Sequence, residues 1–206
     1  MLIGLDFDNT IAGYDHVFPA VAEREGMIAK GQAKTKTDVR DLLRHQPGGE
    51  TAWMTLQGKV YGSHMNQARL LDGVSTFLER CRELKIAVCI VSHKTEIGHF
   101  DPDKINLRAA ARAWMESLSF FEPSGFGLDP DSVYFETTRA EKVARVAALN
   151  CTHFVDDLEE VFLESGFPET VDGYLLAINR TPLPTGPFKA MPDWKSIANS
   201  IFSTAS

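Results

Sequence analysis

The chain has 206 residues, of which 44% are hydrophobic and 24% are charged. This much apolar material can form a full core and excludes a disordered chain, and the length predicts one domain with a small insertion. There are 21 Lys and Arg residues and 28 Asp and Glu residues, so the formal charge is −7. Because so acidic a chain has no net attraction to nucleic acid or to an anionic membrane, we expect a small substrate.

No apolar stretch approaches the roughly 20 residues that a membrane span needs. Met1 leads directly into apolar residues without a basic leader, so we expect a soluble, cytoplasmic protein. The three cysteines lack CxxC spacing and lie among apolar residues, which predicts reduced core thiols at Cys81, Cys89 and Cys151. Nothing in the sequence predicts the oligomeric state.

The first predicted element is a strand over residues 2–5, an apolar run that leads into Asp6 and Asp8. A buried strand seldom ends in two carboxylates unless a cation lies nearby. If both residues are extended, their side chains leave the same side of the strand, because side chains alternate along it. This start of the chain is therefore a candidate site.

Residues 12–71 do not continue the strand pattern. Their apolar spacing predicts three helices, with breaks at Gly31 and at residues 46–49. These helices are Val17 to Met27, Asp38 to His45 behind a cap at Thr37, and Thr51 to Tyr61. We expect a small helical insertion over 12–71, within a core that consists of residues 1–11 and 72–206.

Helical and strand patterns alternate after the insertion. Apolar residues at helical spacing predict helices over 74–84, 107–118 and 140–149, the second preceded by a cap and first turn at Asp101 and Pro102. Apolar runs predict strands over 86–91, 132–135, 153–155 and 174–178. The proline-rich tail ends in a short predicted helix with Trp194, Ile197 and Ile201 on one side.

This alternation predicts a doubly wound, Rossmann-like α/β fold, with a parallel sheet covered on both faces. In such folds ligands bind at the carboxyl ends of the strands. Polar residues follow three of the predicted strands at that edge, and they are Asp6 and Asp8, Ser92, and Asp156 and Asp157. Two close carboxylates are tolerated when a divalent cation lies between them or when one keeps its proton. Both arrangements suit phosphoryl transfer with Mg²⁺.

Four motifs make the sequence resemble the haloacid dehalogenase-like (HAD) superfamily of phosphohydrolases. The first, DxDx(T/V), matches residues 6–10, and the second, an apolar strand that ends in Ser or Thr, matches Ile90-Val91-Ser92. The third is a lysine near the start of a later helix, here Lys142, and the fourth is an acidic pair after a strand, here Asp156 and Asp157. Together, in this order, the motifs are a specific signal. They cover the chain from Leu2 to about Ile178.

The resemblance implies a role for each matching residue. Asp6 would be the nucleophile that forms an aspartyl-phosphate, and Asp8 the general acid and then the base. Ser92 and Lys142 would hold the phosphoryl group. Mg²⁺ would be held by Asp6, Asp156 and Asp157 with the backbone carbonyl of Asp8. Because the dehalogenase branch lacks an acid at the Asp8 position, phosphoryl transfer is favoured. The resemblance also makes the α-helical insertion a mobile cap that selects the substrate.

Several residues have two interpretations. Lys94 competes with Lys142 as the phosphate lysine, and Asn9, Thr10 and His93 are further candidates for substrate contacts, although each is also typical of a turn or loop. Polar residues of the insertion suit either substrate binding or a solvated helix face, and we prefer the latter for each of Arg40, Arg44, His45, His64, Gln67 and Arg69.

The function that we expect is Mg²⁺-dependent hydrolysis of a small phosphorylated metabolite, with nucleotide and sugar phosphates equally suitable. We expect no nucleic-acid partner and no membrane partner. Two alternatives stay open: transfer of the phosphoryl group to an acceptor other than water, as in a mutase or phosphotransferase, and a catalytically idle binding module.

Overall fold

The computed structural model describes residues 1–101 and 103–203. The chain forms two compact units, each of which is built from more than one segment. The core unit comprises Met1–Ala12, Leu70–Lys94 and Leu118–Ser206, and the second unit comprises Gly13–Arg69 and Thr95–Ser117. The sequence prediction placed residues 95–117 with the core, and the structure groups them with the predicted insertion.

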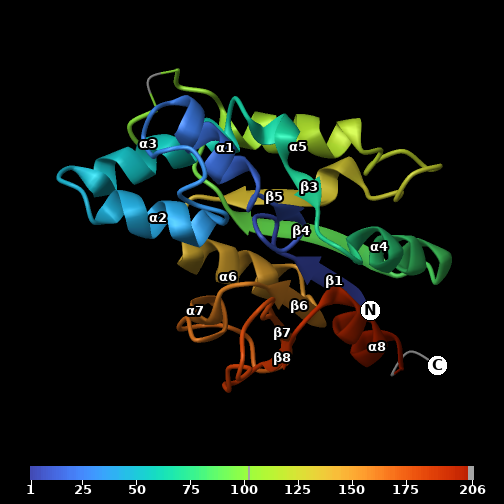
Figure 1. Ribbon diagram of the computed structural model, residues 1–206. Coiled ribbons are helices and arrows are strands. Elements are labelled where there is room, and N and C mark those ends of the chain that lie inside the picture. Colours follow the sequence, from blue (N-terminus) through green and yellow to red (C-terminus); the bar gives the residue numbers. More distant parts are fainter. Residues whose placement is uncertain (102, 204–206) are drawn as a thin grey trace. The chain divides into compact units, whose positions relative to one another are not determined.

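A six-stranded parallel sheet forms the centre of the core unit (Figure 1). Its strand order is β5-β4-β1-β6-β7-β8, which is the Rossmann order 3-2-1-4-5-6 when these strands are numbered along the chain. The strands are β1 Leu2–Leu5, β4 Ala87–His93, β5 Val133–Glu136, β6 His153–Asp156, β7 Asp172–Leu176 and β8 Lys189–Met191. The doubly wound prediction is confirmed. No apolar run predicts β8, which lies between Pro187 and Pro192 of the tail.

Helices cover both faces of this sheet. On one face, α6 (Arg139–Ala148) and the short α7 (Glu159–Phe162) pack their apolar side chains onto β4, β6 and β7. On the other face, α8 (Trp194–Ser203) contacts β7 through the hydroxyls of Ser200 and Tyr174, and it packs beside α4 (Val74–Glu83) (Figure 1). Tyr174 and its neighbour Leu175 point to opposite faces, because side chains alternate along a strand. A 3₁₀ turn over Pro130–Ser132 leads into β5.

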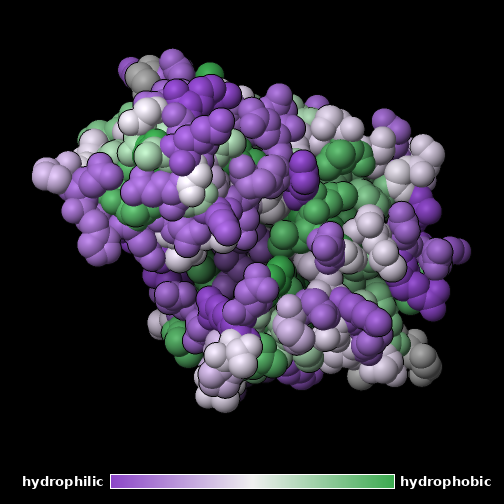
Figure 2. Space-filling view, viewed as in Figure 1, coloured by the Kyte–Doolittle hydropathy of each residue, from purple (hydrophilic) through white to green (hydrophobic). Residues whose placement is uncertain are grey.

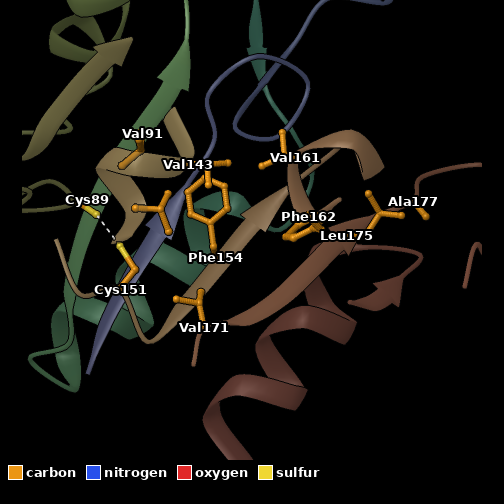
Figure 3. Close-up of a cluster of buried hydrophobic side chains, with 11 residues drawn as sticks. Cys89, Val91, Val143, Cys151, Phe154, Val161, Phe162, Val171, Leu175 and Ala177 are labelled. Atoms are coloured by element: carbon orange, nitrogen blue, oxygen red, sulfur yellow. Dashed lines mark hydrogen bonds between the residues drawn. The ribbon is translucent and has the colours of Figure 1, made fainter. Parts of the chain in front are cut away.

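Figure 3 shows the core cluster beneath α6 and α7, with Cys89 and Cys151 at one end. Their sulfur atoms are 3.7 Å apart, and all three cysteines are free and buried, as the sequence predicts. Gly4 of the central strand β1 makes room for this packing. A Cβ atom at Gly4 would lie 2.7 Å from a ring carbon of Phe154 and 3.1 Å from Cys151 Sγ. A side chain at this position would therefore clash with the core.

The second unit is helical. It contains α1 (Val17–Arg24), α2 (Lys36–Arg44), α3 (Gly49–Tyr61), a 3₁₀ turn over Met65–Gln67, and α5 (Leu107–Ser117). Aromatic side chains form its core. The Phe18 and Trp53 rings stack with their centroids 5.0 Å apart, and the Tyr14 and Tyr61 rings meet edge-on with their centroids 4.9 Å apart. The surface over α1 and α2 is mostly hydrophilic in Figure 2, as expected of solvated helix faces.

Residues 95–117 belong to the second unit because glycines let their backbone approach α3. A Cβ atom at Gly98 would lie 2.5 Å from the Cα atom of Gly58, and one at Gly58 would lie 2.8 Å from Cβ of Asp101. The indole N–H of Trp114 on α5 also donates to the carbonyl of Ala68, at 3.1 Å. The two boundary strands, β2 (Ala12–Gly13) and β3 (Arg69–Leu70), pair with each other.

Two predicted helix caps are wrong. Helix α2 is capped by Thr35 rather than Thr37, because Thr35 and Asp38 bond each other's backbone N–H groups in a capping box. Helix α5 begins at Leu107, and Asn106 Oδ1 accepts from the N–H of Ala109. The carboxylate of Asp101 instead accepts from the N–H groups of Asp103 and Ile105 in the preceding turn. Pro102 lies outside the described residues.

No helix within residues 1–101 and 103–203 has the length and apolar character of a membrane span.

Candidate active site

The candidate site lies where the strand order of the core sheet reverses. The chain runs from β1 outward to β4 and β5, and then returns to β6 on the other side of β1. A doubly wound sheet binds ligands in the crevice at this point, beyond the carboxyl ends of the strands. Asp6 directly follows β1 and Asp156 ends β6, and the N–H of Asp6 donates to the carbonyl of Val155 at 2.9 Å. The fold thus brings two predicted site residues together.

Lys142 joins these two carboxylates. Its ammonium Nζ lies 2.6 Å from Asp6 Oδ1 and 2.5 Å from Asp156 Oδ2, and its side chain is 2% exposed. Lys142 stands in the first turn of α6, whose start is fixed by a capping box between Thr138 and Glu141. Helix α6 therefore holds the lysine at the carboxyl edge of the sheet.

Burial and the neighbouring charges shift the pKa values of Lys142 and Asp156. Burial raises the pKa of Asp156 to about 7, an effect that the Lys142 ammonium opposes and the Asp6 carboxylate increases. Burial by itself lowers the pKa of Lys142, but the carboxylates of Asp156 and Asp6 outweigh it and raise this pKa above its ordinary value. Lys142 therefore stays positively charged, and burial favours the protonated form of Asp156.

The residues present fit a hard divalent cation. Asp6, Asp156 and Asp157 each offer a carboxylate oxygen within 4.8 Å of the others. Mg²⁺ prefers oxygen ligands of this kind, and three carboxylates facing one ammonium leave negative charge for it to balance. Lys142 contacts one oxygen each of Asp6 and Asp156. The second oxygen of Asp156 accepts from the N–H of Leu158 at 3.0 Å, and a carboxylate oxygen that accepts one such bond can still bind a metal ion through its other lone pair. The Asp8 side chain is not part of this group, and the use of its backbone carbonyl as a ligand stays a prediction.

The Asp8 carboxylate pairs with the other predicted lysine. Lys94 Nζ lies 2.8 Å from Asp8 Oδ2 and 3.1 Å from Oδ1. Lys94 follows β4 by one residue, and its N–H donates to the carbonyl of Glu136 at 2.9 Å. The two candidate phosphate lysines are therefore both buried in the core unit, and each contacts a different aspartate of the first motif. From the sequence the two lysines are competitors for one role, and no pattern in it predicts this division.

The remaining predicted residues lie near the same edge. Ser92 is buried near the end of β4, two residues beyond Ile90, the partner of Leu5 across the sheet, whereas His93 is exposed. Asn9 has a φ of 58°, which lets the chain turn sharply after Asp8. Thr10 is fully buried and its hydroxyl has no hydrogen-bond partner within the described residues, and its contact with substrate stays a prediction.

The structure adds Trp194, which the sequence analysis assigned only to the face of a tail helix. Its indole N–H donates to the carbonyl of Thr10 at 2.9 Å, and its side chain is 1% exposed. The C-terminal helix α8 thus supports the loop that carries Asp8. Since the two residues are 184 positions apart, no local pattern could reveal this contact.

The polar residues proposed for the insertion all lie in the second unit. Arg44 pairs with exposed Glu50 at 2.6 Å, Arg40 pairs with exposed Asp41 at 2.9 Å, and His64 contacts Arg24 at 2.6 Å. The first two pairs are typical of a solvated helix face. Substrate binding by any of these six side chains stays an alternative that the geometry does not test.

No protein-family model and no curated protein matches the sequence. Solved structures do share its fold. A HAD-family hydrolase from Deinococcus radiodurans R1, with bound phosphate and sodium, is 11% identical with a TM-score of 0.57, over 99% of this chain and 96% of that one. Protein tyrosine kinase A of Mycobacterium tuberculosis is 11% identical with a TM-score of 0.63, over 97% of each chain. An L-2-haloacid dehalogenase is 15% identical with a TM-score of 0.56, over 98% of each.

These three proteins carry names of different activities, so the likeness establishes architecture alone. The chain therefore has the fold of the haloacid dehalogenase-like hydrolases, as the order of its four motifs predicts.

Proposed function

We propose that this chain is a Mg²⁺-dependent phosphomonoesterase that acts through an aspartyl-phosphate on Asp6. The observation that carries the proposal is the joining of Asp6 and Asp156 by the buried Lys142, beside Asp157. A phosphate dianion cannot approach three carboxylates unless cations offset the repulsion. The lysine supplies one such cation, and the donor set suits a divalent second one.

The residues divide the reaction between them. A carboxylate oxygen of Asp6 bonds to phosphorus as the bond to the leaving oxygen breaks, and Asp8 gives that oxygen a proton. Water then attacks phosphorus, the bond to Asp6 breaks, and Asp8 takes the proton from water. Lys142 and Ser92 hold the phosphoryl oxygens. Asp6, Asp156, Asp157 and the backbone carbonyl of Asp8 would hold Mg²⁺. The bound ion would neutralise further negative charge on the phosphoryl group.

Asp8 favours phosphoryl transfer over dehalogenation. A halide leaves without a proton, whereas an alkoxide needs one, and an acid beside the nucleophile is useful only for the latter. The proposed substrate is a small phosphorylated metabolite, and the proposed role of the helical second unit is that of a cap that selects it. Nucleotide and sugar phosphates both remain candidates.

The test is hydrolysis of a panel of phosphorylated metabolites with Mg²⁺ by wild-type protein and by Asp6→Asn. We expect the substitution to lower kcat by more than about 10³-fold, because it removes the nucleophile. Asp172→Asn, at an exposed aspartate paired with Lys189, is the matched control and should keep wild-type activity. Near wild-type turnover by Asp6→Asn would contradict the mechanism.

The same assay separates the alternatives. Release of inorganic phosphate that equals substrate loss supports hydrolysis. Transfer of the phosphoryl group to an organic acceptor supports a phosphotransferase. A wild-type protein that hydrolyses nothing on the panel and fails to bind beryllofluoride with Mg²⁺ would indicate a binding module.

A further inference from the structure

Lys94 is a buried lysine to which the proposed reaction assigns no step. Its side chain is 2% exposed, and its ammonium contacts both oxygens of Asp8, at 2.8 and 3.1 Å. An ammonium is seldom removed from water to this extent without a partner. The Asp8 side chain is itself only 18% exposed, so the pair is largely shielded from solvent.

The lysine is anchored at both ends. Its backbone N–H extends the pairing of β4 with β5 by donating to Glu136, at 2.9 Å. Its ammonium lies 5.5 Å from the centroid of the Phe7 ring, the residue between Asp6 and Asp8. A two-oxygen contact from an anchored cation fixes both the position and the rotation of a carboxylate. Lys94 is therefore placed to decide where the Asp8 carboxylate points.

Lys142 already serves the other carboxylates. It contacts Asp6 and Asp156, the nucleophile and a proposed metal ligand, from helix α6. Lys94 reaches Asp8 from the end of β4, the strand that pairs with β1. Two buried lysines with separate partners indicate separate tasks.

We propose that Lys94 is a positioning residue that acts through Asp8. It holds the carboxylate where it can give a proton to the leaving oxygen and later take one from water. This inference rests on the proposed function and assigns it a residue outside the motif set. Loss of Lys94 should therefore damage only those steps in which Asp8 moves a proton.

The dependence of kcat/KM on the leaving group tests this assignment in the 206-residue chain. An alkyl phosphate needs a proton on its leaving oxygen, whereas 2,4-dinitrophenyl phosphate does not. We expect Lys94→Met to lower kcat/KM about 10²-fold for the alkyl phosphate and less than about threefold for the dinitrophenyl ester. Lys189→Met, which removes an exposed lysine, is the matched control and should change neither value.

The second step gives an independent readout. With the dinitrophenyl ester, formation of the aspartyl-phosphate stays fast in Lys94→Met while water attack slows. Rapid-mixing experiments should then show a burst of dinitrophenolate equal to the enzyme concentration. A loss of equal size for both substrates, without a burst, would overturn the positioning role.

A double-mutant cycle separates action through Asp8 from direct contact with phosphate. In an Asp8→Asn background, Lys94→Met should cause no further loss beyond about twofold, because its partner is already gone. A further tenfold loss, together with weaker inhibition by inorganic phosphate, would show instead that Lys94 binds the phosphoryl group. If Lys94→Met alone unfolds, the double variant should still fold, because it removes both charges of the pair, and it is compared with Asp8→Asn.

Different results would contradict the proposed function and the proposed role of Lys94. If Asp6→Asn retains activity, or wild-type protein has none, the proposed function fails. If Asp6→Asn is inactive while Lys94→Met loses both substrates equally, only the role of Lys94 is wrong.

Discussion

The indole N–H of Trp194 and the carbonyl oxygen of Thr10 form a buried hydrogen bond of 2.9 Å that ties the C-terminal helix to the loop after Asp8. That helix lies beyond the part of the chain covered by the sequence motifs. The loop geometry on which Asp8 depends is therefore set partly by the tail.

Trp194→Phe should destabilise the protein by about 1–3 kcal/mol, because it leaves a buried carbonyl without its donor. Urea unfolding followed by circular dichroism measures the change. Trp114→Phe is a matched control in the second unit, since it removes an indole bond of 3.1 Å to the carbonyl of Ala68. We expect similar losses of stability, with kcat/KM lowered more by Trp194→Phe. Equal effects on kcat/KM would contradict a role for Trp194 at the loop.

Mg²⁺ should stabilise the folded protein, because a ligand that binds only the native state raises the unfolding free energy with its concentration. At a concentration of 100 times Kd the gain is about 2.7 kcal/mol. Thermal unfolding with EDTA and with increasing Mg²⁺ measures this, and EDTA should also abolish hydrolysis. Asp157→Asn should weaken the stabilisation, whereas Asp172→Asn should leave it intact. Stabilisation that survives in Asp157→Asn would place the metal ion elsewhere.

Gly4→Ala should destabilise the core unit by about 1–3 kcal/mol, because the added methyl would lie 2.7 Å from the Phe154 ring. Chemical denaturation gives the value. Gly4→Ala should lower the unfolding free energy less in a Phe154→Leu background than in the wild-type protein, because the ring that the methyl meets is gone. If the two changes were simply additive, the clash would not be the cause.

Thr35→Ala should cost about 1 kcal/mol of stability, because it removes the side-chain cap of α2. Thr37→Ala, inside the same helix, should change the unfolding free energy by less than about 0.5 kcal/mol. Differential scanning calorimetry of the two variants compares a cap with a neighbour of the same residue type. A larger effect at Thr37 would contradict the observed capping box.

The alternating pattern of the core could be predicted from sequence because each buried parallel strand is a local apolar run. Positions at strand ends follow from it, which is why Asp6, Ser92 and Asp156 were assigned to one edge. The pairing of Lys94 with Asp8 could not be predicted, since two lysines near one acidic cluster have no pattern that distinguishes their partners. Membership of residues 95–117 in the second unit depends on the meeting of Gly58 and Gly98, which is a tertiary contact.

The bond between Lys142 and Asp6 joins residues 136 positions apart, and Asp156 completes the contact from a third segment. Long-range contacts of this kind form late, because the closure of large loops precedes them. The acidic centre exists only after β1, α6 and β6 have assembled. Uptake of a divalent ion during refolding would therefore mark the moment at which the central sheet is complete, and fragments that end before residue 156 should not acquire it.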